Sequence, residues 1–296
     1  MKRIKRNIQI KSRNPEPAAT TSTRPPTASN PPSVICNPVR TRLQNGLPVF
    51  GITITTPSVE AAAHAATLGF HFLWVEMEHS PLTLETLRLI VLATRSLPAA
   101  VFARVPVVEL WTAKRVLDQG VSGVIFPFTG SAEEAACAAA ACRYPPVGRR
   151  GSGAGAAVRT WPQPGNYYDS ADREVVSVCV IEQASAINHI DAIAATPGVD
   201  VLFVGTSDLS FSLGLRGRQD EPALDAAIAR IVEAARRHSK FLGRPAGTPE
   251  AVRNHMEQGF LLFQMPTEIA LMELGARQLL NPLGISGIPA DQLAQY

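Results

Sequence analysis

The chain has 296 residues, enough for one large core or two modest ones, and its 46% hydrophobic and 18% charged residues are globular values. No apolar run reaches the roughly 18 residues of a membrane-spanning helix, so we expect no membrane partner. Residues 1–45 carry nine basic residues and one acidic residue, whereas the remainder carries 19 and 24, within a net charge of +3. The mildly acidic body argues against a nucleic-acid-binding protein.

The first 45 residues differ from the rest of the chain. They are rich in Pro, Ser, Thr and Asn and show no hydrophobic period, which predicts a disordered basic tail before a domain at 46–296. Four cysteines without a CxxC pair indicate free thiols in a reducing compartment. We expect a cytoplasmic protein. The alternative is a mitochondrial one whose tail is a transit peptide, although its many prolines favour a solvated extension.

Short apolar runs alternate with helical periods from Pro48 onward. The pattern predicts strands at 48–54, 70–76, 100–105, 122–128, 175–182, 200–205, 240–244 and 260–265. It predicts helices, each with one buried face, at 58–68, 83–96, 109–119, 131–143, 184–196, 222–238, 248–258 and 267–280. Eight alternating units imply parallel strands that close into a (β/α)8 TIM barrel. The alternative, a doubly wound sheet, lacks the Gly-x-Gly-x-x-Gly loop that would follow the first strand.

Polar side chains gather where the predicted strands end. In α/β barrels these carboxyl ends carry the chemistry, because they all face one mouth. The apolar run 72–75 ends abruptly in Glu76, Glu78 and His79, and the third strand ends in Arg104. The other strand ends contribute Glu182, Gly205-Thr-Ser-Asp208, Gln264 and Glu268. Any one of these residues could be a rim salt bridge or a solvated side chain, but together they predict a site.

The residue types at this mouth suggest particular roles. Glu182 and Asp208 are hard oxygen ligands on neighbouring strands, which suits Mg²⁺ or Mn²⁺, with Co²⁺ as a further candidate. Arg104 offers a fixed fork of donors to an anionic oxygen. His79 is the candidate general base, since its unperturbed pKa lies near neutrality. No lysine stands at the carboxyl end of a predicted strand, since Lys114 is in a helix and Lys240 begins a strand, so a Schiff-base mechanism is disfavoured.

Several segments resemble the HpcH/HpaI aldolase family, a branch of the citrate lyase and pyruvate-aldolase barrels. The resemblance covers about residues 45–280. It rests on Leu73-Trp-Val-Glu-Met-Glu-His79-Ser-Pro, Ala103-Arg-Val-Pro, Val116-Leu-Asp-Gln-Gly, Arg143-Tyr-Pro-Pro-Val-Gly-Arg-Arg-Gly151, Val180-Ile-Glu and Phe203-Val-Gly-Thr-Ser-Asp-Leu-Ser. It implies a class II aldolase that reversibly cleaves a 4-hydroxy-2-oxo acid to pyruvate and an aldehyde through a metal-stabilised enolate. It also implies a homo-oligomer, commonly a hexamer.

The resemblance assigns roles residue by residue. It implies that Glu182 and Asp208 hold the metal, that Arg104 binds the enolate oxygen, and that His79 forms a dyad with Asp118. Further substrate contacts are expected from Glu76, Gly205, Thr206 and Ser207.

The chain also departs from the family's usual pattern. Glu76 stands where Asp is usual, Val180 where Gln is usual, and Glu268 follows Pro-Thr where the family has Gly-x-Asp. The aldehyde is therefore less predictable than pyruvate. Two alternatives are a citryl- or malyl-CoA lyase-like enzyme and a non-catalytic barrel homologue.

Overall fold

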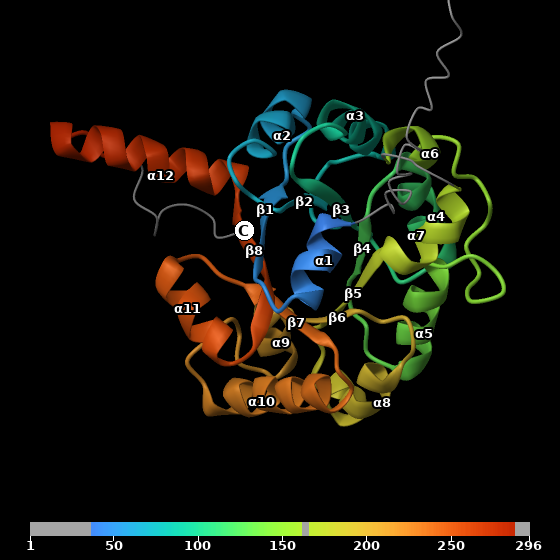
Figure 1. Cartoon of the computed structure of the whole chain (residues 1–296). Helices are drawn as coiled ribbons and strands as arrows, with labels where there is room; N and C mark the ends of the chain where they lie inside the picture. The colour runs from blue at the N-terminus through green and yellow to red at the C-terminus, as the bar shows by residue number, and fades with distance from the viewer. Residues whose placement is uncertain (1–36, 162–165, 288–296) are drawn as a thin grey trace, which may run out of the picture. The chain divides into compact units, whose positions relative to one another are not determined.

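The computed structural model describes residues 37–161 and 166–287, and it contains eight parallel strands that close into a barrel in chain order (Figure 1). The strands are β1 (Val49–Ile54), β2 (Phe72–Glu76), β3 (Ala100–Arg104), β4 (Gly123–Phe126), β5 (Val176–Ile181), β6 (Val201–Val204), β7 (Phe241–Pro245) and β8 (Phe260–Thr267). The predicted (β/α)8 barrel is confirmed.

Most of the helices connect consecutive strands around the outside of the barrel, while one precedes the first strand and one follows the last (Figure 1). They are α1 (Pro38–Gln44), α2 (Val59–Ala65), α3 (Leu84–Thr94), α4 (Leu110–Gln119), α5 (Ala132–Ala141), α6 (Ala157–Thr160), α7 (Tyr167–Glu174), α8 (Ile190–Ala195), α9 (Thr206–Ser212), α10 (Pro222–Arg237), α11 (Pro249–Glu257) and α12 (Glu268–Leu280), with 3-10 turns η1 (Ala184–His189) and η2 (Asn281–Leu283). None of the described helices is long and apolar enough to cross a membrane.

Alternate residues of each strand enter two different cores. On β2, Phe72 and Trp74 join a cluster inside the barrel, whereas Leu73 and Val75 join a larger cluster between the strands and the helices. This follows from the period of two along a strand, and it means that residues two positions beyond an inner-core side chain also point inward. The three cysteines of the described residues, Cys137, Cys142 and Cys179, are free, and Cys36 lies outside them.

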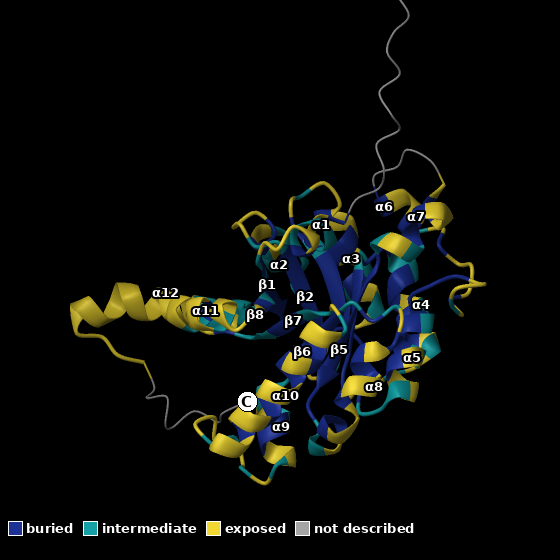
Figure 2. Ribbon diagram, turned by 60° about the horizontal axis from the view of Figure 1, so that its bottom comes forward, coloured by how far each residue is buried: buried dark blue, intermediate teal, exposed yellow. Residues whose placement is uncertain are grey.

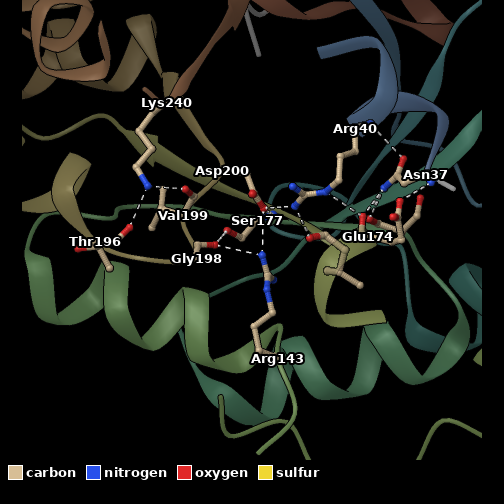
Figure 3. Close-up of polar contacts among 12 residues, drawn as sticks. Asn37, Arg40, Arg143, Glu174, Ser177, Thr196, Gly198, Val199, Asp200 and Lys240 are labelled. Carbon is tan, nitrogen blue, oxygen red and sulfur yellow. Dashed lines mark hydrogen bonds and ion pairs between the residues drawn. The ribbon is translucent and has the colours of Figure 1, made fainter. Parts of the chain in front are cut away.

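Helix α1 closes the amino-terminal end of the barrel, which we call the floor (Figure 1). Val39 and Leu43 are buried in the inner cluster. The side chain of Asn37 accepts from the N–H of Val39, as an N-cap does, and Arg40 reaches Asp200 at 2.7 Å (Figure 3). The expectation of a disordered segment is therefore wrong for residues 37–45. Residues 1–36 lie outside the described part of the chain.

Helix α12 is formed as predicted but has no buried residue. It extends away from the barrel wall, and it is exposed from Met272 to its end (Figures 1 and 2). Its exposed apolar side chains are Ile269, Met272, Leu274, Leu279 and Leu280. By contrast, α10 buries seven residues. The expectation that every helix buries one face within the chain is wrong for α12.

Candidate active site

A cavity of about 130 Å³ lies inside the barrel at the carboxyl ends of the strands. Its lining consists of Trp74, Arg104, Val180, Glu182, Phe203, Gly205, Thr206, Ser207, Asp208, Pro245 and Gln264. The strand period explains this lining, because Arg104 and Glu182 each lie two residues beyond an inner-core side chain. A larger cavity of about 210 Å³ at the other end, near Trp161, is lined by no carboxylate or histidine among the described residues. Of the two cavities, the smaller one is therefore the candidate active site, because carboxylates line it.

Arg104 is the cationic centre of the mouth. Its Nε lies 2.5 Å from Oε2 of Glu78 in an ion pair, and its Nη1 lies 3.5 Å from Oε2 of Glu76. Its Nη2 lies 3.7 Å from Oε2 of Glu182. One guanidinium thus faces three carboxylates, and the mouth carries excess negative charge. Such an arrangement attracts a cation and leaves Arg104 poised beside it.

Glu182 is the most deeply buried carboxylate of this group, with 2% of its surface exposed. Its Oε1 accepts from the backbone N–H of Phe128 at 2.7 Å. Phe128 has a φ of 46°, in the left-handed region that L-residues seldom adopt, so strain is located where the loop after β4 holds this carboxylate. Burial raises the pKa of Glu182 to about 7, assisted by Asp208 and opposed by the Phe128 N–H and Arg104.

The segment after β6 approaches Glu182 closely. A Cβ at Gly205 would lie 2.6 Å from Oε2 of Glu182, so only glycine fits there. The next residues, Thr206 to Asp208, form the first turn of α9 and line the cavity. The structure therefore brings Asp208 to the same cavity as Glu182 and Arg104, as the strand-end argument expected.

Comparison with known proteins identifies this barrel. The family model described as HpcH/HpaI aldolase/citrate lyase matches residues 54–269. The chain belongs to this family. A hydroxypyruvate/pyruvate aldolase from Paraburkholderia phytofirmans is 35% identical over 255 residues, which are 84% of this chain and 98% of the relative. A 5-keto-4-deoxy-D-glucarate aldolase from Salmonella arizonae is 32% identical over 211 residues, which are 71% and 82%.

Solved structures agree with this membership. An HpcH/HpaI aldolase/citrate lyase family protein from Burkholderia cenocepacia superimposes with a TM-score of 0.77 at 31% identity, over 84% of this chain and all of the other. An HpcH/HpaI aldolase from Desulfitobacterium hafniense gives a TM-score of 0.76 at 25% identity, over 84% and 98%. The chain is thus an enzyme of the aldolase type, a carbon–carbon lyase.

In this member of the HpcH/HpaI family, Glu76 organises the loop after β2. Its Oε1 accepts from the N–H groups of Glu78 and His79, and its Oε2 accepts from the indole of Trp74. The Ser80 hydroxyl donates to its backbone carbonyl. Glu76 therefore holds the direction in which Glu78 and His79 point, and its contact with substrate stays a prediction. Burial raises the pKa of Glu78 to about 7 against the opposing charge of Arg104.

The predicted partners His79 and Asp118 are not brought together within this chain. His79 follows β2 at the mouth, its side chain is 60% exposed, and its Nε2 lies 3.6 Å from Oε2 of Glu78. Asp118 occupies the last turn of α4, which runs back toward the floor, and pairs with Arg150 at 3.2 Å. Arg150, fully buried, also contacts the Tyr167 hydroxyl. The dyad stays a prediction.

Sequence reasoning missed two features of the site. The Phe128 N–H has no sequence signal, because it depends on backbone conformation. Pro245 lines the cavity from β7, and its signal was available, since it lies two residues beyond an inward position on its strand. Gln264, which was expected at the end of the eighth strand, lines the cavity from β8.

Proposed function

We propose that this aldolase cleaves a 4-hydroxy-2-oxo acid reversibly to pyruvate and an aldehyde, and that a divalent metal, Mg²⁺ or Mn²⁺, with Co²⁺ as a further candidate, supports the reaction. The observation that carries the proposal is the convergence of Arg104, Glu182 and Asp208 on one buried cavity at the barrel mouth. The names of the similar relatives, pyruvate and 5-keto-4-deoxy-D-glucarate aldolases, support a 2-oxo acid substrate.

The charge balance of the mouth fits a hard divalent cation. Burial raises the pKa of Glu182, and the charge of Asp208 adds to this effect, so the pair is under electrostatic stress that a cation would relieve. Among the described residues, no group of three or more Asp, Glu, His or Cys side chains is arranged as a metal site. Glu182 and Asp208 would therefore hold the ion together with water and substrate oxygens. When bound, the ion would polarise the 2-oxo group.

Arg104 is proposed to donate to the 2-oxo oxygen, where negative charge develops as the C3–C4 bond breaks. Its guanidinium is held by Glu78 and Glu76, which fix the fork without occupying all five donors. Backbone N–H groups of Thr206 and Ser207, in the first turn of α9, would bind the substrate carboxylate, while the Gly205 N–H donates to the Ile181 carbonyl. His79, exposed above the cavity, would remove the proton of the C4 hydroxyl, directly or through water.

The test is a metal-dependence screen of aldol cleavage. The protein is stripped with EDTA, supplied with Mg²⁺, Mn²⁺ or Co²⁺, and given short 4-hydroxy-2-oxo acids while released pyruvate is measured. We expect metal-dependent pyruvate release that Glu182→Gln and Asp208→Asn abolish. Glu233→Gln on the exposed face of α10 is the matched control and should retain activity. Turnover that survives both EDTA and Glu182→Gln, or cleavage of malyl-CoA alone, would contradict the proposal.

We also propose that the enzyme is a homo-oligomer in which α12 docks on a second copy. The helix exposes Met272 and Leu279, which lie seven residues apart and so share one face, and it has no buried residue on its own barrel. A monomer seldom exposes such an apolar stripe. Light scattering after size exclusion should give a molar mass that is a multiple of the chain mass, six-fold if the hexamer implied by the family resemblance forms. Met272→Glu with Leu279→Glu should reduce it, whereas Leu89→Glu on α3 should not.

A further inference from the structure

Gln264 lies on the side of the cavity that the proposed chemistry leaves unused. It is two residues beyond Leu262, a member of the inner cluster, and therefore points into the barrel from β8. It lines the same cavity as Arg104 and Glu182, which come from β3 and β5. In the closed order of eight strands, β8 stands opposite β4, so Gln264 faces these two groups across the mouth.

Gln264 is half-buried, and its side-chain amide has no hydrogen-bond partner among the described residues. Four residues of the cavity lining offer this amide no free hydrogen-bond donor from their side chains. The Trp74 indole already donates to Glu76, Pro245 has no N–H, and Val180 and Phe203 are apolar. An amide that faces a cavity without a protein partner is hydrogen-bonded by water or by a ligand. The amide is thus available to whatever occupies the cavity.

We propose that Gln264 is a specificity-determining residue that hydrogen-bonds a hydroxyl group carried by the substrate next to the bond that breaks. The inference rests on the proposed function, in which Arg104, Glu182, Asp208 and the turn after β6 bind the 2-oxo acid. An uncharged amide both donates and accepts, which matches a hydroxyl better than a carboxylate or an ammonium group. The hydroxyl has two sources, the aldehyde fragment or C3 of the 2-oxo acid.

The experiment compares competing substrates in the metal-loaded enzyme. One arm uses pyruvate with glyceraldehyde against propionaldehyde, and the other uses propionaldehyde with hydroxypyruvate against pyruvate. The variant Gln264→Leu keeps the side-chain volume but removes both hydrogen-bonding groups, and Gln264→Glu keeps an acceptor while losing the donor. Gln119→Leu, at a half-buried glutamine on α4 that does not line the cavity, is the matched control. Thermal unfolding of each variant verifies that it folds.

We expect Gln264→Leu to lower the preference for the hydroxylated compound, as a ratio of kcat/KM values, by about 10-fold in one arm, the magnitude of one lost hydrogen bond. The arm that changes identifies the source of the hydroxyl. Ratios that match the wild type in both arms, with Gln264→Leu folded, overturn the inference. Failure of the proposed function is distinguishable, because the wild-type enzyme itself would then form no product from pyruvate in either arm.

Discussion

The two ends of this barrel hold charged side chains in opposite proportions. At the floor, one carboxylate, Asp200, is shared by Arg40 at 2.7 Å and Arg143 at 3.2 Å, and it also accepts from the N–H of Ser177 (Figure 3). At the mouth, one guanidinium, that of Arg104, faces three carboxylates. Two guanidiniums thus surround one carboxylate at the floor, whereas three carboxylates surround one guanidinium at the mouth.

The difference separates a structural cluster from a site. A buried charge with several opposite partners stabilises its surroundings only modestly, but it is costly to break. Buried charges of one sign destabilise the fold and persist where a ligand uses them. The comparison predicts that substitutions at the floor lower the free energy of unfolding and leave kcat unchanged. Substitutions at the mouth should instead lower kcat/KM.

The largest expected effect is at the mouth. Arg104→Gln should lower kcat/KM for aldol cleavage about 10³-fold, or about 4 kcal/mol, because the developing oxyanion loses its charged donor. Steady-state assays with saturating Mn²⁺ measure it. Arg143→Gln at the floor is the matched control, expected to retain kcat. Equal losses in both variants would remove the distinction between the two ends.

The next effect is at the floor. Asp200→Ala leaves Arg40 and Arg143 without their shared carboxylate, so the free energy of unfolding should fall by about 3 kcal/mol. Urea unfolding measures this change. At temperatures where the variant is folded, its kcat should equal that of the wild type. A lower kcat with normal stability would mean that the floor influences the reaction.

Proton binding by Glu182 at the mouth should make the free energy of unfolding of the metal-free enzyme depend on pH. The pKa of Glu182 is about 7 in the folded chain against an ordinary value of 4.5, so the folded state binds more protons between these values. Stability from this group is therefore present below about pH 4.5 and is lost as the pH rises through 7, by about 3 kcal/mol in all. Urea unfolding in EDTA at pH 5 and 8 tests this.

Two further observations sharpen the pH prediction. Glu182→Gln should reduce this dependence, because the amide does not titrate, and the part that remains should come from Glu78, whose pKa is also raised to about 7. Added Mn²⁺ should restore stability at pH 8 if the carboxylates hold it. A dependence that persists unchanged in Glu182→Gln would show that another group causes it.

The sequence could predict the barrel and the mouth, because alternating strands and helices and the polar strand ends are local patterns. It could not predict α1, whose two buried apolar residues, Val39 and Leu43, are too few to show a period but suffice when the floor receives them. It could not place Asp118 relative to His79, because α4 carries its last turn away from the mouth. Nor can a helical period tell whether a face packs within the chain, as α12 demonstrates.

The smallest predicted effect tests how α1 is held. Asn37 caps the helix by accepting from the Val39 N–H. Its Nδ2 donates to the carbonyl of Ser122 and, as Figure 3 shows, to that of Glu174, each at 2.9 Å. Asn37→Ala should lower the free energy of unfolding by about 1 kcal/mol through the lost cap. The control is Asn45→Ala, at the exposed far end of α1. Because the floor stabilises without reacting, kcat should stay at the wild-type value in both variants, and a fall in Asn37→Ala alone would tie α1 to the mouth.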